Sequence, residues 1–540
     1  MKHLLAGAAL GILCVACNSV ADGAPSVPAD LEVTMPERAA TLIMGTLPEI
    51  SAALEAGDVS SEELVTAYLM RIEEVDRSGP TLQSVLSTNP NAMTDAIESD
   101  ARRAMGKANG PLDGVPILLK DNIESLDPIA TTAGALALKD NVTGRDSPLV
   151  AGLRAQGAII LGKTNLSQWA NFRSNDSMSG WSALGGQVRN PHMLDRNPCG
   201  SSSGSGAAAA ASLAAGTVGT ETNGSIICPS NVNGIVGFKP TVGLVAQDYI
   251  VPISSSQDTA GPMTKSVKGA AMMLTAMATG EGATDYAAAL DAGSLAGQRV
   301  GVLRFAQGET ADIQSKFDAA LAVLEAQGAT LVEIEAFSPD AENFWGDALA
   351  VLEYEFKHTL NEYLASTPDA VTARSLEALI AFNKANADIE LALFDQSLFV
   401  SSEARGPITD EAYISAVANV QSASRENGID KLLSDNDVAM LVSPSGPLSP
   451  RVDPVNGDTW PAWAGAGYLA AIAGYPHITV PMGEVHGVPI GFSIMAGGGS
   501  DADVLSWGYA FEQASQLRAE PQYLPSAEAR PEIAAAMKAK

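Results

Sequence analysis

Histidine is scarce in this sequence, and local motifs for metals or dinucleotides are missing. The chain has five histidines among 540 residues, at the scattered positions His3, His192, His358, His477 and His486. No HExxH pattern occurs, so a zinc site would need ligands from remote segments. The stretch GSSSGSG (200–206) lacks the G-x-G-x-x-G order and follows a polar stretch, which argues against a dinucleotide site. We therefore expect neither a metal nor a cofactor.

Basic residues are also few. Lysine and arginine number 32 against 62 acidic residues, which gives a formal net charge of −30. Affinity for nucleic acids depends on basic side chains that neutralise phosphates, so we expect no nucleic-acid partner. The acidic excess is interpreted as a solvated surface, with a preference for cationic substrates as the alternative. With 46% hydrophobic and 17% charged residues, the chain can bury a large core.

No hydrophobic run is long enough to span a membrane. The apolar stretch Leu4–Ala16 follows a short basic segment and is shorter than a bilayer span, which indicates a signal peptide over residues 1–21. Cleavage can follow Ser19-Val20-Ala21 or precede Cys17, which would then carry a lipid, and we favour this lipoprotein route. We expect a flexible spacer over residues 22–39 and an extracytoplasmic protein, either periplasmic, with or without a lipid anchor, or secreted.

Only four cysteines are present, and two of them follow the predicted signal segment. These are Cys199 and Cys228. A location outside the cytoplasm would allow them to oxidise. The sequence leaves two alternatives open, namely a disulfide between them and two free, buried thiols.

Short apolar runs alternate with helical patterns along most of the chain. Ser60 and Glu63 form a capping box that predicts the start of a helix. Alternation of this kind predicts an α/β fold with a mostly parallel or mixed β-sheet covered by helices on both faces. We expect one catalytic domain over residues 40–530, with a helical insertion at about 340–430 that covers a cleft. Strands are predicted over residues 115–119, 158–161, 299–303, 330–335, 438–442, 477–482 and 489–495.

The stretch CGSSSGSG (199–206) has the composition of a flexible linker. However, an alanine-rich run, AAAAASLAAG, follows directly, whereas a linker should separate two polar domain edges. We therefore predict a buried helix that packs closely against its neighbours. Residues 200–204 also satisfy G-x-S-x-G, the nucleophile elbow of α/β-hydrolases, with His477 or His486 as the base, but no predicted strand precedes the turn.

Lys120 ends the apolar run in GVPILLKDNI (114–123). Burial disfavours the charged form of an amine and lowers its pKa, and a neutral amine is a competent general base for a serine. The alternative is a surface lysine whose aliphatic part covers the end of a strand. A lysine base needs a serine to activate, and the two glycine-flanked turns around Ser201 and Ser225 supply candidate serines.

In several segments the sequence resembles the amidase signature family. The resemblance covers about residues 40–515, and the combination of lysine motif, serine-rich loop and GTETNGS is specific. It implies the α/β fold of that family, with a large mixed, twisted β-sheet covered by helices on both faces. The matching segments are GVPILLKDNI (114–123), TTAGALAL (131–138), GKTNLSQWAN (162–171), CGSSSGSGAAAAA (199–211), GTETNGSIICPSNVNGIVGFKPTVGL (219–244), DTAGPM (258–263), GYPHITVPMG (474–483) and GVPIGFSIMA (487–496).

The resemblance implies a Ser-cisSer-Lys triad. Ser225 takes the position of the nucleophile, Ser201 that of the bridging serine, and Lys120 that of the base. The peptide bond between Gly200 and Ser201 is expected to be cis. Ser202 matches a position that supports the triad by hydrogen bonding.

The oxyanion hole implied by the resemblance consists of backbone N–H groups, those of Thr222, Asn223, Gly224 and Ser225. Asn223 stands where the family usually has glycine, and we expect it to adopt a positive φ. Ile227 stands where many members have arginine, which puts in doubt a contact with a substrate carboxylate at that place.

The resemblance implies hydrolysis of carboxamide bonds through an acyl-enzyme, without a cofactor. NLSQWANFRSNDSMSGWSALGGQ and SSSQDTAGPM are most similar to the peptide amidase branch, which implies ammonia release from C-terminally amidated peptides. An acylamide or aryl-amide hydrolase is the alternative within the family. The glutaminase subunit of the tRNA-dependent amidotransferase is disfavoured by the acidic charge and the export signal. A lipid-anchored solute-binding protein is the non-enzymatic alternative. The expected partner is thus a small-molecule or peptide amide.

Overall fold

The computed structural model describes residues 36–539. The predicted signal peptide, either cleavage site and most of the predicted spacer lie outside the described residues. The first helix begins at Glu37, so residues 37–39 are helical where a spacer was expected. None of the helices in the described part of the chain has the length and apolar character needed to cross a bilayer.

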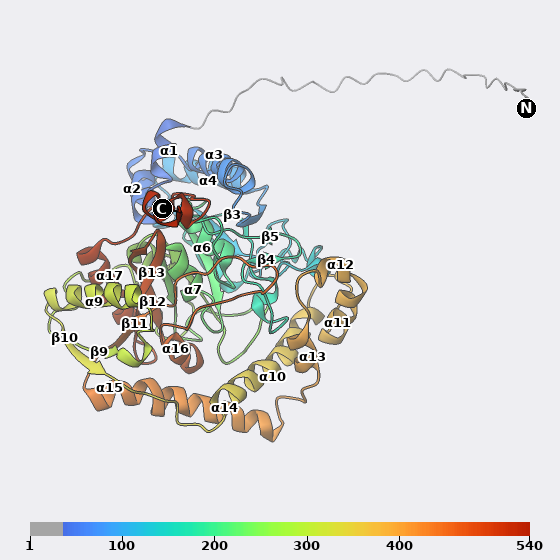
Figure 1. The fold of residues 1–540 in the computed structure, drawn as a ribbon. Coiled ribbons are helices and arrows are strands. Elements are labelled where there is room, and N and C mark those ends of the chain that lie inside the picture. Colours follow the sequence, from blue (N-terminus) through green and yellow to red (C-terminus); the bar gives the residue numbers. More distant parts are fainter. Residues whose placement is uncertain (1–35, 540) are drawn as a thin grey trace, which may run out of the picture. The chain divides into compact units, whose positions relative to one another are not determined.

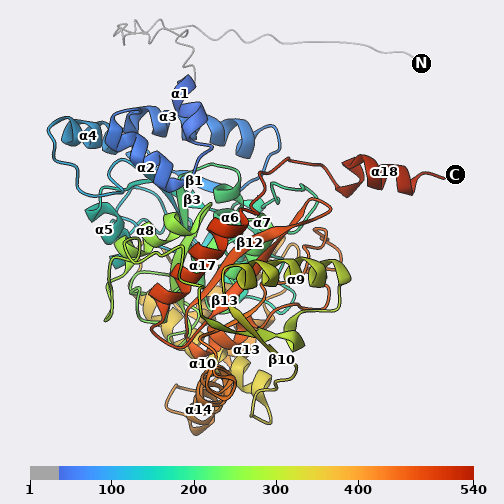
Figure 2. The ribbon, with the colours of Figure 1, turned by 90° about the vertical axis from the view of Figure 1, so that its left-hand side faces the viewer.

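An eleven-stranded mixed sheet forms the centre of the fold (Figures 1 and 2). The strand order is β1-β3-β2-β6-β8-β7-β12-β13-β11-β9-β10, and β4 and β5 form a separate hairpin. The strands are β1 (Val85–Thr88), β2 (Pro116–Lys120), β3 (Ile159–Thr164), β4 (Trp181–Ser182), β5 (Gly186–Gln187), β6 (Gly216–Glu221), β7 (Val236–Lys239), β8 (Thr259–Thr264), β9 (Arg299–Leu303), β10 (Thr330–Ile334), β11 (Met440–Pro444), β12 (His477–Val485) and β13 (Val488–Met495).

Two groups of parallel strands flank an antiparallel middle, and the edge strand β1 pairs antiparallel with β3. β2 pairs in parallel with β3 and with β6, and β9 pairs in parallel with β10 and with β11. Between these groups, β8, β7, β12 and β13 pair with antiparallel neighbours. The predicted mixed sheet is thus confirmed, and each predicted strand overlaps an observed one.

Helices cover both faces of the sheet. Along β11 to β13, helices α9 and α17 lie on one face and α7 and α16 on the other (Figures 1 and 2). The helices are α1 (Glu37–Leu42), α2 (Leu47–Ala56), α3 (Ser61–Arg71), α4 (Ala92–Ala104), α5 (Pro148–Ala155), α6 (Ser203–Ala210), α7 (Ile227–Asn233), α8 (Val267–Met277), α9 (Ala311–Ala326), α10 (Phe344–Ala365), α11 (Leu376–Ala385), α12 (Ala387–Glu390), α13 (Ser397–Glu403), α14 (Glu411–Ser424), α15 (Asp430–Asn436), α16 (Gly467–Ala473), α17 (Asp501–Ser515) and α18 (Pro531–Met537).

Two local predictions about helices are confirmed. The side chain of Ser60 accepts from the backbone N–H of Glu63, and the Glu63 carboxylate accepts from the N–H of Ser60, so α3 begins with a capping box. The glycine, serine and alanine run forms α6, which is buried at every position. A Cβ on Gly204 would lie 2.3 Å from the carbonyl oxygen of Asn165, so only glycine allows this close approach. The stretch is a packed helix and not a linker.

Between β10 and β11 the chain forms the helices α10 to α15, which lie to one side of the sheet (Figure 1). Aromatic edge contacts hold this helical segment against the residues that follow β3. Trp169 and Phe172 contact Phe399 of α13 and Phe356 of α10, with ring centroids 5.6 and 5.0 Å apart. The buried Arg173 lies 3.5 Å from the carboxylate of Glu390 in α12. Packing and charge therefore fix the segment beside the serine-rich loop.

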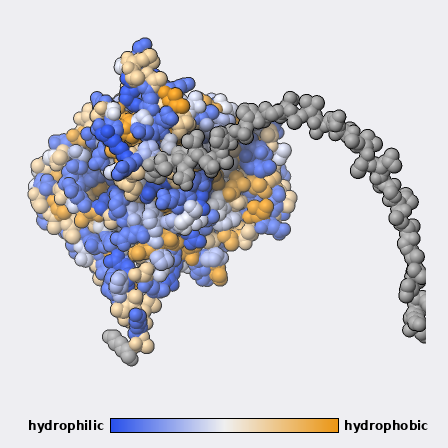
Figure 3. Space-filling view, turned by 90° about the horizontal axis from the view of Figure 1, so that it is seen from above, coloured by the Kyte–Doolittle hydropathy of each residue, from blue (hydrophilic) through white to orange (hydrophobic). Residues whose placement is uncertain are grey.

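The surface agrees with the composition of the chain. On the face shown in Figure 3, apolar residues lie in small groups among hydrophilic ones. Such a surface is ordinary for a protein with a large excess of acidic residues.

Candidate active site

The sheet brings the predicted lysine and the two predicted serine turns to one edge. β2 and β6 are adjacent and parallel, so their carboxyl ends meet at the same edge. Lys120 is the last residue of β2, and the turn 222–226 follows β6. The serine-rich turn adjoins them, because the N–H of Ser202 donates to the carbonyl oxygen of Ser225 at 3.2 Å.

Lys120 is fully buried beside Ser201. Its Nζ lies 2.7 Å from the Oγ of Ser201, 2.9 Å from the Oγ1 of Thr220 and 3.3 Å from the carbonyl oxygen of Thr220. Burial lowers the pKa of Lys120 to about 7, although the carboxylates of Asp258 and Glu221 act in the opposite direction. Near neutral pH a large share of this amine is therefore uncharged.

The peptide bond between Gly200 and Ser201 is cis, as expected. A Cβ on Gly200 would lie 2.2 Å from the Oγ of Ser167, so the turn is closely packed at this point. The carbonyl oxygen of Ser201 accepts from the N–H of Ser167 at 3.0 Å. Ser202 is buried, and its hydroxyl donates to the carbonyl oxygen of Thr220 and accepts from the N–H of the same residue. Ser202 thus ties the serine-rich turn to the end of β6.

The turn that carries Ser225 has backbone donors without acceptors. Within the described residues, the N–H groups of Asn223, Gly224 and Ser225 donate no hydrogen bond. The hydroxyl of Thr222 donates to the Oδ1 of Asp258 at 2.5 Å, which fixes the start of the turn. The positive φ falls on Gly224, at 83°, so the expectation of a positive φ at Asn223 is wrong. The left-handed backbone conformation thus falls on a glycine, one residue after Asn223. The Asn223 side chain is exposed.

Glu221 holds the other end of this turn. One of its oxygens, Oε2, accepts from the N–H groups of Ile226 at 2.7 Å and Ile227 at 3.0 Å, where α7 begins. Such a carboxylate satisfies orphan N–H groups at a helix start and suits the helix dipole. The turn around Ser225 is therefore anchored on both sides.

A disulfide joins the two serine turns. Cys199 precedes Gly200, Cys228 lies three residues after Ser225, and their Cα atoms are 5.9 Å apart. Both cysteines are buried, and Trp460 packs against them. The alternative that the sequence left open is thus decided in favour of a bridge.

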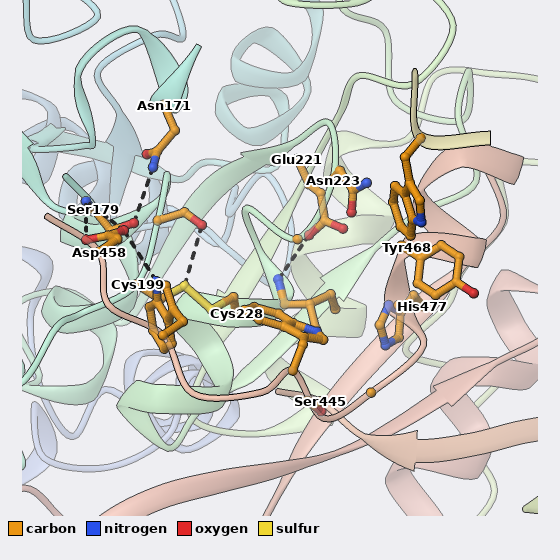
Figure 4. A pocket seen from close by; sticks show the side chains of 18 residues that line it. Asn171, Ser179, Cys199, Glu221, Asn223, Cys228, Ser445, Asp458, Tyr468 and His477 are labelled. Atoms are coloured by element: carbon orange, nitrogen blue, oxygen red, sulfur yellow. Dashed lines mark hydrogen bonds between the residues drawn. A yellow bond between two sulfur atoms is a disulfide. The ribbon is translucent and has the colours of Figure 1, made fainter. Parts of the chain in front are cut away.

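A cavity of about 490 Å³ opens beside these turns (Figure 4). Its lining combines backbone from the turns with four large aromatic side chains, those of Trp345, Trp460, Trp463 and Tyr468. Figure 4 shows Asp458 and Ser179 at one end, Tyr468 and His477 at the other, and Glu221 between the two ends. Ile227 also lines the cavity.

Among the residues that the structure describes, no histidine pairs with a serine of the two predicted turns. His477 lines the cavity, but its Nε2 lies 2.7 Å from the Oγ of Ser493, and burial lowers its pKa to about 3. His486 lies in the hairpin between β12 and β13. No strand among the described residues leads into Gly200, so the nucleophile-elbow alternative lacks its structural context. The described residues also contain no cluster of side chains suited to hold a metal.

Sequence reasoning missed four residues around the lysine and the turns. Thr220 contacts the amine of Lys120, and Asn122 donates to the Oγ1 of Thr220 at 3.0 Å. Asp258 and Glu221 hold the turn that carries Ser225. A signal was present, because Thr220 and Glu221 belong to GTETNGS and Asp258 begins DTAGPM.

Comparisons with known proteins agree with this architecture. The model of the Amidase family matches residues 63–505. A probable amidase of Arabidopsis thaliana is 34% identical over 502 residues, which cover 89% of this chain and 91% of the relative. The solved native peptide amidase of Stenotrophomonas maltophilia is 42% identical with a TM-score of 0.84, covering 88% of this chain and 98% of that one. An amidase family protein of Bacillus anthracis is 32% identical with a TM-score of 0.81, covering 90% and 94%.

Together these findings define a class of protein: an enzyme that hydrolyses amides. More particularly, the chain belongs to the Amidase family, because the family model matches most of its length. The non-enzymatic alternative, a solute-binding protein, is thereby excluded.

Proposed function

We propose that this protein releases ammonia from C-terminally amidated peptides through a triad of Lys120, Ser201 and Ser225. The observation that carries the proposal is the contact of 2.7 Å between the buried Nζ of Lys120 and the Oγ of Ser201. A lysine buried in this way without a carboxylate partner at contact distance has little value as an ion-pair residue. It has the properties of a general base poised near neutral pH.

The contacts of the amine fit a neutral base. A neutral amine has two N–H bonds and one lone pair. Thr220 offers two acceptors, its hydroxyl at 2.9 Å and its carbonyl oxygen at 3.3 Å, so the two N–H bonds have partners. The lone pair is then free to accept the proton of the Ser201 hydroxyl.

The proposed reaction starts with two proton transfers. Ser201 gives its proton to Lys120 and takes the proton of Ser225, and the Oγ of Ser225 then forms a bond to the carbonyl carbon of the amide. The negative charge that develops on the carbonyl oxygen is stabilised by the free N–H groups of Asn223 and Gly224. One such donor typically contributes about 3 kcal/mol to the stability of the transition state.

The second half of the proposed reaction returns the protons. When the carbon–nitrogen bond breaks, the nitrogen takes a proton through Ser201 and leaves as ammonia, and an ester to Ser225 remains. Water, activated by the same relay, attacks this ester, which gives the carboxylic acid and restores the three side chains. No cofactor enters either half of the reaction.

The peptide substrate is supported by the cavity and by the relatives. The aromatic lining and the volume of about 490 Å³ suit amino-acid side chains next to the scissile amide. The similarity to the peptide amidase of Stenotrophomonas maltophilia favours the same substrate class over acylamides and aryl amides.

Two measurements test this proposal. Ammonia release is compared among peptide amides, free peptides, fatty amides and aryl amides, and we expect peptide amides to react fastest. Intact mass of acid-quenched enzyme should show an acyl adduct, located on Ser225 by fragmentation and absent in Ser225→Ala. An adduct on another residue, or faster turnover of aryl amides, contradicts the corresponding part of the proposal.

We also propose that the enzyme acts outside the cytoplasm, because the N-terminal sequence has the pattern of an export signal. The mass of the mature N-terminal peptide distinguishes the two routes. A lipid on Cys17 supports the lipoprotein route, an N-terminus at Asp22 supports ordinary cleavage, and an intact Met1 contradicts export.

A further inference from the structure

The charges on the wall of the cavity are all of one sign. Two carboxylates, those of Glu221 and Asp458, line it, and no lysine or arginine of the described residues does. The only imidazole in the lining, that of His477, is neutral above about pH 4, because burial lowers its pKa to about 3. Ile227 adds an apolar side chain. The cavity therefore offers a negative potential with no basic group in its lining to balance it.

Glu221 and Asp458 differ in how their oxygens are used. Asp458 accepts from the N–H of Ser179, from the amide of Asn197 and from the indole N–H of Trp460, so both its oxygens have partners. Glu221 uses only Oε2, while its Oε1 is buried and has no hydrogen-bond partner among the described residues. The side chain is only 1% exposed and faces the cavity (Figure 4). Of the two carboxylates, Glu221 thus has fewer hydrogen-bond donors, and the buried amines of Lys120 and Lys239 act on it only through space.

Aromatic rings complete the wall. Three of the six tryptophans of the chain line this one cavity, and Trp345 and Trp463 remain 60% and 50% exposed. The rings of Trp345 and Tyr468 lie 5.0 Å apart, and those of Trp460 and Trp463 lie 5.9 Å apart. The faces of such rings attract cations. Low-dielectric walls lined by charge of one sign also concentrate the field inside a cleft.

We propose that this cavity selects amides by the charge of the acyl group: it favours a cationic group and rejects a carboxylate, with Glu221 as the principal determinant. The inference rests on the proposed hydrolysis of peptide amides and names the preferred substrate class. It also explains how product leaves, because the acid formed from the amide is an anion in a negative cavity.

Three amides of matched size test the selection. Nα-acetyl-lysinamide and Nα-acetyl-norleucinamide share their aliphatic chain and differ in the terminal ammonium, and the α-amide of Nα-acetylglutamate supplies a carboxylate. At low ionic strength we expect kcat/KM for the lysine amide to exceed that for the norleucine amide about tenfold. The glutamate amide should react at least about tenfold more slowly than the norleucine amide.

The variant Glu221→Gln isolates the charge. Glutamine keeps an acceptor oxygen for the N–H groups of Ile226 and Ile227 but removes the carboxylate. The readout is the ratio of kcat/KM between the lysine and norleucine amides, because a general change in turnover affects both substrates equally. We expect this ratio to fall to about one third of the wild-type value or less.

Glu512→Gln is the matched control. Glu512 also accepts a backbone N–H at the start of a helix, that of Val267 in α8, but it lies outside the cavity lining. In Glu512→Gln, the ratio of kcat/KM between the lysine and norleucine amides should equal that of the wild type. If Glu221→Gln does not fold, Trp345→Leu tests the same selection from an exposed position, and we expect its ratio to fall about threefold.

The outcomes separate the two proposals. If none of several peptide amides is hydrolysed, the proposed function fails. If peptide amides are hydrolysed but the three acetylated amides react equally, the proposed function stands and the charge selection is overturned. A folded Glu221→Gln variant with the wild-type ratio removes Glu221 from the selection.

Discussion

The two walls of the cavity are built in different ways. One wall comes from the turns at one edge of the sheet, which backbone hydrogen bonds fix. Lys120 and Ser201 are buried beside these turns and are not part of the cavity lining. The opposite wall comes from α10 and from the stretch between β11 and α16, and it presents the exposed rings of Trp345 and Trp463. The residues proposed to carry the chemistry are thus held from several sides. The exposed rings of the other wall depend on single side chains, which can change without disturbing the core.

The largest effect should follow from removing the proposed nucleophile. Ser225→Ala is expected to lower turnover by about 10⁴-fold or more, since no other group forms the ester. Ser225 is half-buried and its side chain makes no hydrogen bond among the described residues, so the thermal midpoint should stay close to that of the wild type. Ammonia release and thermal unfolding of the same sample measure both. Wild-type activity in this variant would exclude Ser225 as the nucleophile.

The next largest effect concerns the proposed base, Lys120, which is buried beside the serine turns. Because only the neutral amine accepts a proton, kcat/KM of the wild type should rise tenfold per pH unit at acid pH and level off above an apparent pKa near 7, the value to which burial lowers the pKa of Lys120. Lys120→Met should lose about 10³-fold in activity and this pH dependence. A rate that is flat from pH 5 to pH 9 argues against a lysine base.

A smaller effect is expected from the bridge that joins the two turns. The double variant Cys199→Ala/Cys228→Ala opens a loop with a sequence separation of 29 residues, and the free energy of unfolding should fall by about 3 kcal/mol. Activity should fall much less than in Ser225→Ala, because the contact between Ser202 and Ser225 remains. Urea unfolding with and without reductant measures the change. Equal stability of variant and wild type would contradict a stabilising bridge.

The smallest effect should come from the aromatic wall. Trp463→Ala removes a half-exposed ring that is not part of either serine turn, so KM for a peptide amide should rise about threefold while kcat stays within a factor of two. Steady-state kinetics at constant pH separate the two parameters. A large loss in kcat with unchanged KM would show that the aromatic wall takes part in the chemistry, and the contrast between the walls would not hold.

Sequence patterns predicted the strands in longer apolar runs better than the short or less apolar ones. The run 299–303 is observed as β9 without change of bounds, whereas β1, β6, β7, β8 and the hairpin strands β4 and β5 were missed. β8 contains Gly261 and Pro262, which are unusual in strands. A Cβ on Gly261 would lie 2.0 Å from the carbonyl oxygen of Phe238, so the neighbouring strand requires glycine there. Tertiary packing, which a local pattern does not contain, overrides propensity at this place.

The residues of the site divide in the same way, into those predicted from local motifs and those whose roles depend on contacts with distant segments. Lys120 and the two serine turns stood out in the sequence because their motifs are local. Asp258 did not, since its role depends on the hydroxyl of Thr222 in a different segment. A role for Glu221, a carboxylate on the cavity wall, was not predicted. This residue lies in GTETNGS, where the predicted roles fell on residues 222–225.

By itself the sequence determined the chemical groups and the local elements: a lysine at the end of an apolar run, serine turns flanked by glycine, and a helix of small residues. Only the tertiary structure decided which groups meet. It paired Cys199 with Cys228 and gathered Trp345, Trp463 and Glu221 around one cavity. The physical reason is that local structure depends on the hydrogen bonds and side-chain sizes of a few neighbouring residues along the chain. Contacts between distant segments exist only after the strands have paired and the helices have packed on them.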